Sequence, residues 1–223
     1  MGYHWDFSGL NPYWGAFLRG LGVTAALGVL SSALGTLAGI PLAFALRTTR
    51  IISGPLTAFL DAVRAVPNLV LIFFFYYFPY EAVLGVRSPS PFVAVLVALI
   101  AAQAAYSADL FRVALDGVPA LQVEGLRAMG FSPSQVLRFA VLPSVVRHAL
   151  PGHVALWIGN LKLSSLASVV GVEDVVFVAK VAMSQSFRSL ESWLVVAASY
   201  VVIVLPFTYL LRSLESSAWI NRK

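Results

Sequence analysis

The sequence predicts an all-α membrane protein with about five transmembrane helices, and three observations lead to this fold class. Hydrophobic residues make up 59% of the 223 residues and charged residues only 11%, whereas roughly a quarter is charged in soluble domains. Uncharged stretches of about 20 residues, the length that crosses roughly 30 Å of hydrocarbon, recur along the chain. Basic residues gather between alternate stretches, as in cytoplasmic loops. One compact membrane domain is therefore expected.

A lead-in precedes the first span. Residues 1–18 are rich in Tyr and Trp and lack the basic start of a cleaved signal peptide, so we expect them at the outer membrane interface. Within a transmembrane domain over residues 19–215, the spans are expected at about 20–46, 55–79, 91–112, 145–170 and 192–212. In the first span Ser31, Gly35 and Gly39 lie four residues apart, which lets a neighbouring helix approach closely.

The basic residues predict an orientation. Those on one side of the expected spans are Arg47, Arg50, Arg112, Arg127, Arg138, Arg147, Arg212, Arg222 and Lys223. The opposite side carries a mixed and less basic set. By the positive-inside rule the N-terminus is outside and the tail, residues 216–223, is cytoplasmic. Topology thus accounts for the net charge of +5, and we expect membrane lipid rather than nucleic acid as a partner.

The long cytoplasmic segment, residues 116–143, is named the elbow here because it is expected to form two short helices. Pro119 suits a first helical position and Gly130 suits a helix terminator, so the first helix is expected over about 119–129. From periodicity alone, an amphipathic loop that lies on the lipid headgroups is an equally open interpretation.

The second elbow helix has a clear start. Ser132, Pro133 and Gln135 supply an N-cap, a first-turn proline and a capping-box partner, so a helix is expected from there to about Leu142. Pro143 is expected to break or kink the chain before the fourth span.

Two acid–base pairs lie near the cytoplasmic ends of the second and third spans. Asp61 and Arg64 are three residues apart, as are Asp109 and Arg112. Charges in a membrane are costly unless they are paired or face a cavity. One hypothesis is that these pairs hold the inner end of a path closed or fix the elbow, and the alternative is ordinary helix-end salt bridges.

A polar stripe interrupts the fourth span. Lys162 is flanked there by Asn160, Ser164, Ser165 and Ser168. A substrate carboxylate could pair with the ammonium while the hydroxyls form hydrogen bonds, although a lysine that reaches to the membrane interface is the alternative. Polar side chains of the second and third spans, Asn68, Gln103 and Ser107, are expected to line the same cavity.

No catalytic or metal site is predicted. Cysteine is absent, and His4, His148 and His153 show no metal-ligand spacing. The nucleophile motif G-x-S-x-G is missing, and so is the Gly-Lys pair of a phosphate-binding loop, so no cofactor is expected on this chain.

Several motifs resemble one family. Glu124, Gly130 and the pair Leu142-Pro143 have the spacing of the Glu-Ala-Ala loop of ABC importer permeases, although Gly125 and Leu126 replace its two alanines. The family's polar amino acid branch, which imports histidine, glutamine, glutamate or arginine, is resembled by four further segments in order. These segments are DAVRAVP, AYSADLFRVAL, LKLSSLASVVGVEDV and SQSFRSLESWL.

The resemblance implies a type I ABC importer permease fold in the bacterial cytoplasmic membrane. It implies ATPase subunits that bind ATP and Mg²⁺, a second permease copy or paralogue, and an extracytoplasmic amino-acid-binding protein. The elbow would couple to the ATPase, with Glu124, Arg127, Gly130, Phe131 and Ser132 as its contact residues. The function so implied is uptake of a polar amino acid, with no enzyme activity in this chain.

One residue departs from the family pattern: Leu163 stands where the family usually has Asp after the lysine. The sequence leaves open which amino acid is carried. Two readings from other classes also stay open, an ATP-independent secondary transporter and a membrane-embedded transferase. The elbow favours the importer, because an uncoupled carrier has no need of it.

Overall fold

The structure is a computed structural model that describes residues 3–220, apart from the side chains at 214, 215 and 217–220, and every regular element in that part is helical. The elements are η1 (Ser8–Tyr13), α1 (Trp14–Ala45), α2 (Arg50–Ala65), α3 (Asn68–Tyr77), α4 (Tyr80–Leu84), α5 (Pro91–Asp116), α6 (Ala120–Ala128), α7 (Pro133–Val136), a π-helical turn (Leu137–Val141), α8 (Leu142–Leu163), η3 (Ser164–Val170), α9 (Val175–Ser186) and α10 (Ser189–Ile220). The predicted all-α fold class is confirmed.

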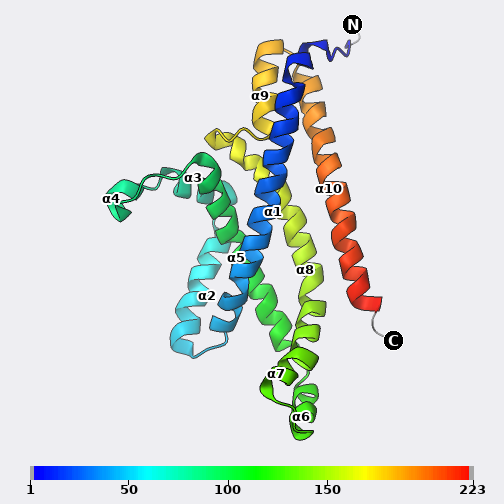
Figure 1. Cartoon of the computed structure of the whole chain (residues 1–223). Helices are drawn as coiled ribbons and strands as arrows, with labels where there is room; N and C mark the ends of the chain where they lie inside the picture. The colour runs from blue at the N-terminus through cyan, green and yellow to red at the C-terminus, as the bar shows by residue number, and fades with distance from the viewer. Residues whose placement is uncertain (1–2, 221–223) are drawn as a thin grey trace.

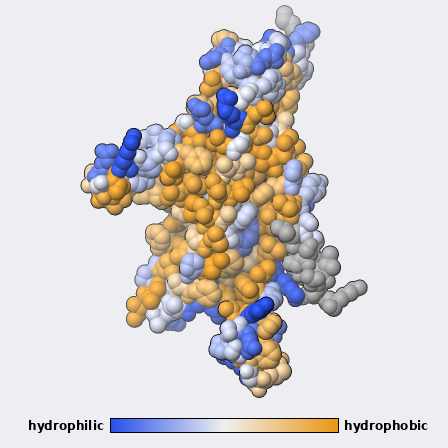
Figure 2. Space-filling model, viewed as in Figure 1, coloured by the Kyte–Doolittle hydropathy of each residue, from blue (hydrophilic) through white to orange (hydrophobic). Residues whose placement is uncertain are grey.

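Four of these helices are long and apolar enough to cross a membrane: α1, α5, α10, and the continuous helical stretch that contains α8. Figure 1 shows them side by side, with α9 and the N-terminus at one end and α6 and α7 at the other. In Figure 2 hydrophobic residues cover most of the middle of this face, and hydrophilic residues gather toward its ends. That distribution suits a protein that spans a bilayer.

Helix α1 packs closely along α5, as its small residues predict. A Cβ added at Gly35 would lie 2.5 Å from the Gln103 Cβ, and one at Gly39 would lie 2.6 Å from the Ser107 Cβ. Neither position has room for a side chain. The two glycines therefore set the distance between α1 and the polar side chains of α5.

The expected second span at 55–79 is divided into two helices in the structure. Helices α2 and α3 cover this range but are bent by 102° at a short break, so they form a broken span or a re-entrant loop. Val66 is extended because a residue before proline avoids the helical region, and Pro67 has no N–H to donate to the preceding turn. The bend places Asn68 at the start of α3.

One further expectation needs correction, and one segment between the expected spans is helical. Pro143 does not break the chain, which stays helical from Pro133 to Val170. The π-helical turn Leu137–Val141 precedes α8 and shifts the pattern of backbone hydrogen bonds at the start of that helix. The missing N–H of Pro143, in the first turn of α8, is therefore tolerated. Residues 175–186, which lie between the expected fourth and fifth spans, form the short apolar helix α9.

Candidate functional site

Polar side chains from three helices meet in a small pocket between α3, α5 and α8, called the amide pocket here. It has a volume of about 120 Å³. The lining residues are Asn68, Ala102, Gln103, Tyr106, Ala155, Leu156, Gly159, Asn160 and Leu163. The predicted association of Asn68 with Gln103 is therefore present in the structure.

The orientation of the Asn160 amide follows from its neighbours on α1. The Ser31 hydroxyl donates its single proton to the Leu27 carbonyl oxygen at 2.5 Å, so it can only accept from Asn160. The Asn160 Nδ2 donates to Ser31 Oγ at 2.8 Å and to Ser32 Oγ at 3.2 Å. With its amino group committed to α1, Asn160 presents its carbonyl oxygen as the remaining acceptor.

Gln103 is held in the same way. It is buried, and its Nε2 donates to Thr36 Oγ1 at 3.4 Å and to Ser107 Oγ at 3.5 Å. None of the described residues donates to the carbonyl oxygen of Gln103 or of Asn160. Ser107 thus positions Gln103 and does not itself line the amide pocket.

The other predicted substrate residues lie elsewhere. Lys162 is exposed, its side chain makes no hydrogen bond or ion pair with any described residue, and it does not line the amide pocket. Ser164 donates to backbone oxygens of Leu161 and Thr24, and Ser165 donates to that of Lys162. The expectation of one cavity for all six candidates is corrected, because the turn into η3 directs these hydroxyls to backbone carbonyls.

The two predicted acid–base pairs form one cluster. Arg64 pairs with Asp61 and also reaches Asp109 across from α2 to α5 at 2.9 Å, and Asp109 pairs with Arg112 at 2.5 Å. The Tyr106 hydroxyl donates to the Arg64 carbonyl oxygen at 3.4 Å. The link between Arg64 and Asp109 was not predicted, and it ties the bent α2–α3 unit to the helix that leads into the elbow.

The first helix of the elbow forms where it was predicted, one residue shorter at each end. It ends at Gly130, which has a φ of +84°. The N–H of Gly130 donates to the Arg127 carbonyl oxygen and that of Phe131 to the Leu126 carbonyl oxygen, which is the Schellman arrangement. Glu124 and Arg127 lie exposed on its surface.

The second elbow helix begins with the predicted capping box. The Ser132 Oγ accepts from the Gln135 N–H at 3.4 Å, and the Gln135 side chain accepts from the Ser132 N–H at 2.8 Å. The Phe131 and Phe139 rings meet edge to face, 6.2 Å apart. Apolar side chains nevertheless stay exposed along the elbow: Leu121, Met129, Leu137, Phe139 and Leu142.

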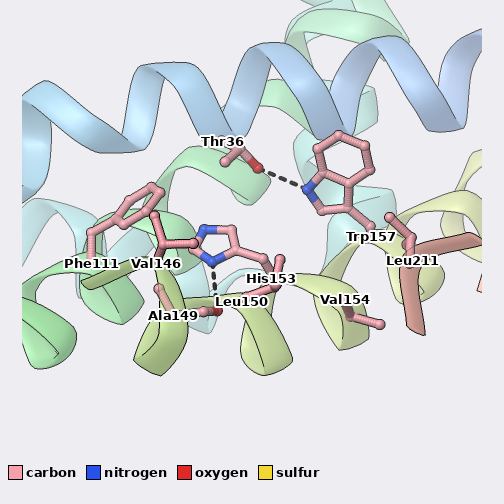
Figure 3. A pocket seen from close by; sticks show the side chains of 9 residues that line it. All are labelled: Thr36, Phe111, Val146, Ala149, Leu150, His153, Val154, Trp157 and Leu211. Carbon is pink, nitrogen blue, oxygen red and sulfur yellow. Dashed lines mark hydrogen bonds between the residues drawn. The ribbon is translucent and has the colours of Figure 1, made fainter. Parts of the chain in front are cut away.

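A separate apolar pocket of about 310 Å³ lies beside α8 and contains His153 (Figure 3). The His153 Nδ1 donates to the Ala149 carbonyl oxygen at 2.9 Å, and its ring packs 4.4 Å from that of Phe111. Trp157 donates to Thr36 Oγ1 across the pocket at 2.9 Å. His153 is thus a buried residue of the helix packing. No group of three or more His, Asp or Glu residues in the described part of the chain is arranged to hold a metal ion.

Sequence reasoning missed a polar network at the end of the molecule that carries α9 and the N-terminus, which is called the outer end here after the orientation predicted from the sequence. The Tyr3 hydroxyl donates to the buried Glu191 carboxylate at 2.5 Å, and the Asp6 N–H donates to its other oxygen at 3.0 Å. Arg188 donates to Asp6 at 2.6 Å. Hydrogen bonds from Ser8, together with the Arg188 charge, hold the pKa of Asp6 below its usual value. The sequence indicated that acidic and basic residues are mixed on this side of the membrane. It did not indicate which of them form pairs.

Asp174 is a second buried acid at the same end. Its side chain accepts from the Phe177 N–H at 2.8 Å and caps α9, and its Oδ2 has no partner among the described residues. A Cβ added at Gly20 of α1 would lie 2.9 Å from the Asp174 carbonyl carbon, so α1 packs directly against the Asp174 backbone. This packing keeps Asp174 buried. Burial raises the pKa of Asp174 to about 6.

Comparisons with known proteins place this geometry in context. Residues 35–219 match the family described as binding-protein-dependent transport system inner membrane component. The chain is 29% identical over 211 residues to the glutamine transport system permease protein GlnP of Escherichia coli (strain K12), covering 94% of this chain and 96% of that one. It is 31% identical over 221 residues to the octopine transport system permease protein OccM of Rhizobium radiobacter, with 93% and 88% covered.

Solved structures agree in fold. A crystal structure of an amino acid ABC transporter with histidines superposes with a TM-score of 0.83 at 27% identity, covering 96% of this chain and 100% of that one. An inward-facing MetNI methionine ABC transporter shares the fold with a TM-score of 0.73 at 20% identity, over 93% and 98% of the two chains.

Proposed function

The chain belongs to the family of binding-protein-dependent inner membrane transport components, and from this membership we propose that it forms the membrane path of an ATP-driven importer for a polar amino acid. The observation that carries the proposal is the elbow, which is well formed by its own caps yet exposes apolar side chains such as Leu121 and Met129. A surface of this kind needs a partner.

The partner of the elbow is an ATPase subunit that binds ATP and Mg²⁺, since this chain has no phosphate-binding loop. Glu124, Arg127, Phe131 and Ser132 lie on or beside the exposed surface and would contact it, while Gly130 fixes the turn between the helices. Helix α5 leads into the elbow and α8 leads out of it, so closure of the ATPases would move both helices together.

The substrate path runs along α3, α5 and α8. Asn68 and Gln103 line the amide pocket there, and Lys162 is an exposed cation near the end of α8. An unpaired ammonium within a span needs a counter-charge or water. We therefore keep Lys162, with Ser164 and Ser165 near it, as a candidate contact for the substrate carboxylate outside the amide pocket.

The cluster of Arg64, Asp61, Asp109 and Arg112 has a mechanical role in this proposal. Because Arg64 bridges α2 and Asp109 on α5, motion of the elbow is transmitted through α5 to the bent α2–α3 unit. Since α3 carries Asn68, the same motion would open and close the pocket.

A second permease subunit, either a copy or a paralogue, would cover helix α10. This helix is the least buried of the long helices and exposes Val201, Val202, Leu205 and Tyr209. The end of the molecule that carries α9 and the N-terminus would face outward, toward an amino-acid-binding protein, and the C-terminus would lie in the cytoplasm. The positive-inside rule supports this orientation in the bacterial cytoplasmic membrane.

The test is reconstitution. The permease, its ATPase, any paired permease and the binding protein are placed in proteoliposomes, and uptake of labelled amino acids is followed with and without ATP. We expect uptake only with ATP and all partners present. Uptake that persists without the ATPase, driven by an ion gradient, would instead identify a secondary transporter.

A further inference from the structure

The amide pocket contains no charged side chain. Its polar lining residues are Asn68, Gln103, Tyr106 and Asn160, and the other lining residues are apolar. The charged cluster that Tyr106 contacts is already committed, because Arg64 is paired with Asp61 and Asp109. A charged ligand group that entered the pocket would therefore lose its water and gain no counter-charge, which is costly within a membrane.

The pocket instead offers hydrogen bonds of a defined kind. Asn160 and Gln103 have committed their amino groups to hydroxyls of α1 and α5, so their carbonyl oxygens remain to accept from a ligand N–H. Asn68, on the other wall, has both an amino group and a carbonyl oxygen. A primary amide has the complementary set, two N–H donors and one acceptor oxygen.

Size and apolar contact agree with this match. A volume of about 120 Å³ gives room for the carboxamide end of a side chain. Leu156 and Leu163 provide apolar walls for methylene groups. The zwitterionic end of the substrate would stay in the wider path.

We propose that the amide pocket selects the side chain of the transported amino acid and takes a neutral carboxamide, as in glutamine or asparagine, in preference to a carboxylate or guanidinium. This inference rests on the proposed transport function and names its substrate class. Leu163 is an apolar wall residue of the pocket, and a carboxylate at this position would supply a counter-charge to a cationic ligand group.

The test measures binding to the permease–ATPase complex in lipid nanodiscs without the binding protein, so that the binding protein's own selectivity does not enter. Radiolabelled glutamine, asparagine, glutamate and arginine are the probes. We expect saturable binding of the two amides, with glutamate and arginine at least about tenfold weaker, since one ordinary hydrogen bond left unmade already costs about that factor. Arginine or glutamate binding as tightly as glutamine, or no measurable glutamine binding, would overturn the proposal.

Two substitutions at one position sharpen the result. Leu163→Asp should improve arginine binding about tenfold relative to glutamine, whereas Leu163→Asn, which has the same shape without the charge, should preserve the preference for the amide. Gln103→Glu is a second charge-introducing variant in case Leu163→Asp folds poorly. An unchanged arginine-to-glutamine ratio in both charged variants would count against the assignment.

Failure of this inference is distinguishable from failure of the transport function. If the complete transporter takes up a charged amino acid in an ATP-dependent manner, the function stands and only the selectivity falls. If no amino acid is taken up with all partners present, the transport function itself fails.

Discussion

The two ends of this molecule are stabilised in different ways. At the outer end, residues nearly the whole chain apart are joined: Tyr3 and Asp6 bond to Glu191, and Arg188 bonds to Asp6. At the opposite end, the elbow is held mainly by local contacts, the Gly130 turn and the Ser132 capping box. The outer end buries its acids, while the elbow leaves large apolar residues exposed.

This difference separates a part that is held together within its own chain from a part that, in the proposed function, binds another protein. A long-range network within this chain fixes the N-terminal segment against the start of α10 and the segment that follows α9. The elbow has a fixed local shape but little tertiary support, so its exposed apolar residues gain burial only from a second protein. Changes at the elbow should therefore affect coupling, and changes at the outer end should affect stability.

The largest effect is expected at the elbow. Leu121 and Met129 are exposed to 82% and 67%, so Leu121→Asp combined with Met129→Asp should leave the fold intact. Loss of two central apolar contacts should weaken ATPase binding about 30-fold or more, and ATP-dependent uptake should disappear. The matched control is Leu84→Asp in α4, 59% exposed at a distance from the elbow, which should bind the ATPase normally. Equal ATPase binding by both variants would contradict the account.

The next effect is a pH dependence confined to the outer end. Burial raises the pKa of Asp174 from 3.8 to about 6, so the folded chain keeps this proton at pH values at which the unfolded chain has lost it. Stability should therefore fall as pH rises from about 4 to about 6 and then level off, by about 2 to 3 kcal/mol in all.

Asp174→Asn isolates this effect. Asparagine also caps a helix, so the variant should keep α9 while removing the slope between pH 4 and pH 6. Thermal unfolding in nanodiscs across this range compares the two proteins. A slope that is the same in the variant would assign the pH dependence to other groups.

A smaller effect is expected between the two ends. Asp109→Asn removes one carboxylate that pairs with both Arg64 and Arg112, and these side chains are only partly buried, so about 1 kcal/mol of stability should be lost. Asp61→Asn, whose carboxylate is 57% exposed, should cost less and leave uptake unchanged. If the cluster transmits motion, Asp109→Asn should also lower uptake without lowering ATPase binding.

The smallest effect is expected for Tyr3→Phe, which removes only the hydrogen bond to Glu191. Hydrogen exchange in residues 3–13 should become faster, with a fall of a few degrees or less in the unfolding temperature. ATPase binding should be normal. Reduced ATPase binding in this variant would mean that the two ends are not independent.

The features that could be predicted from the sequence are mainly those held by local contacts. The first elbow helix was predicted to within a residue, and so was the start of the second, because Gly130 and the pair Ser132 and Gln135 act on their immediate neighbours. The predicted end of the second helix near Leu142 was wrong, since the chain stays helical to Val170. The packing of Gly35 and Gly39 against α5 also followed from their spacing.

What could not be predicted depends on contacts between distant segments. The 102° bend at Val66, the link from Arg64 to Asp109 and the outer network require the tertiary arrangement. The candidate site was predicted in part for the same reason. Asn68 and Gln103 meet in the amide pocket, while the turn into η3 sends Ser164 and Ser165 to backbone oxygens.

The most direct test of the account is to find what covers the elbow. Because the chain has no cysteine, Leu121→Cys provides a single attachment point for a photocrosslinker, with Leu84→Cys as the control. In the assembled complex the account predicts that the crosslinker at position 121 joins the ATPase subunit and the one at position 84 does not. Crosslinks from position 121 to lipid alone, with the ATPase present and active, would contradict it.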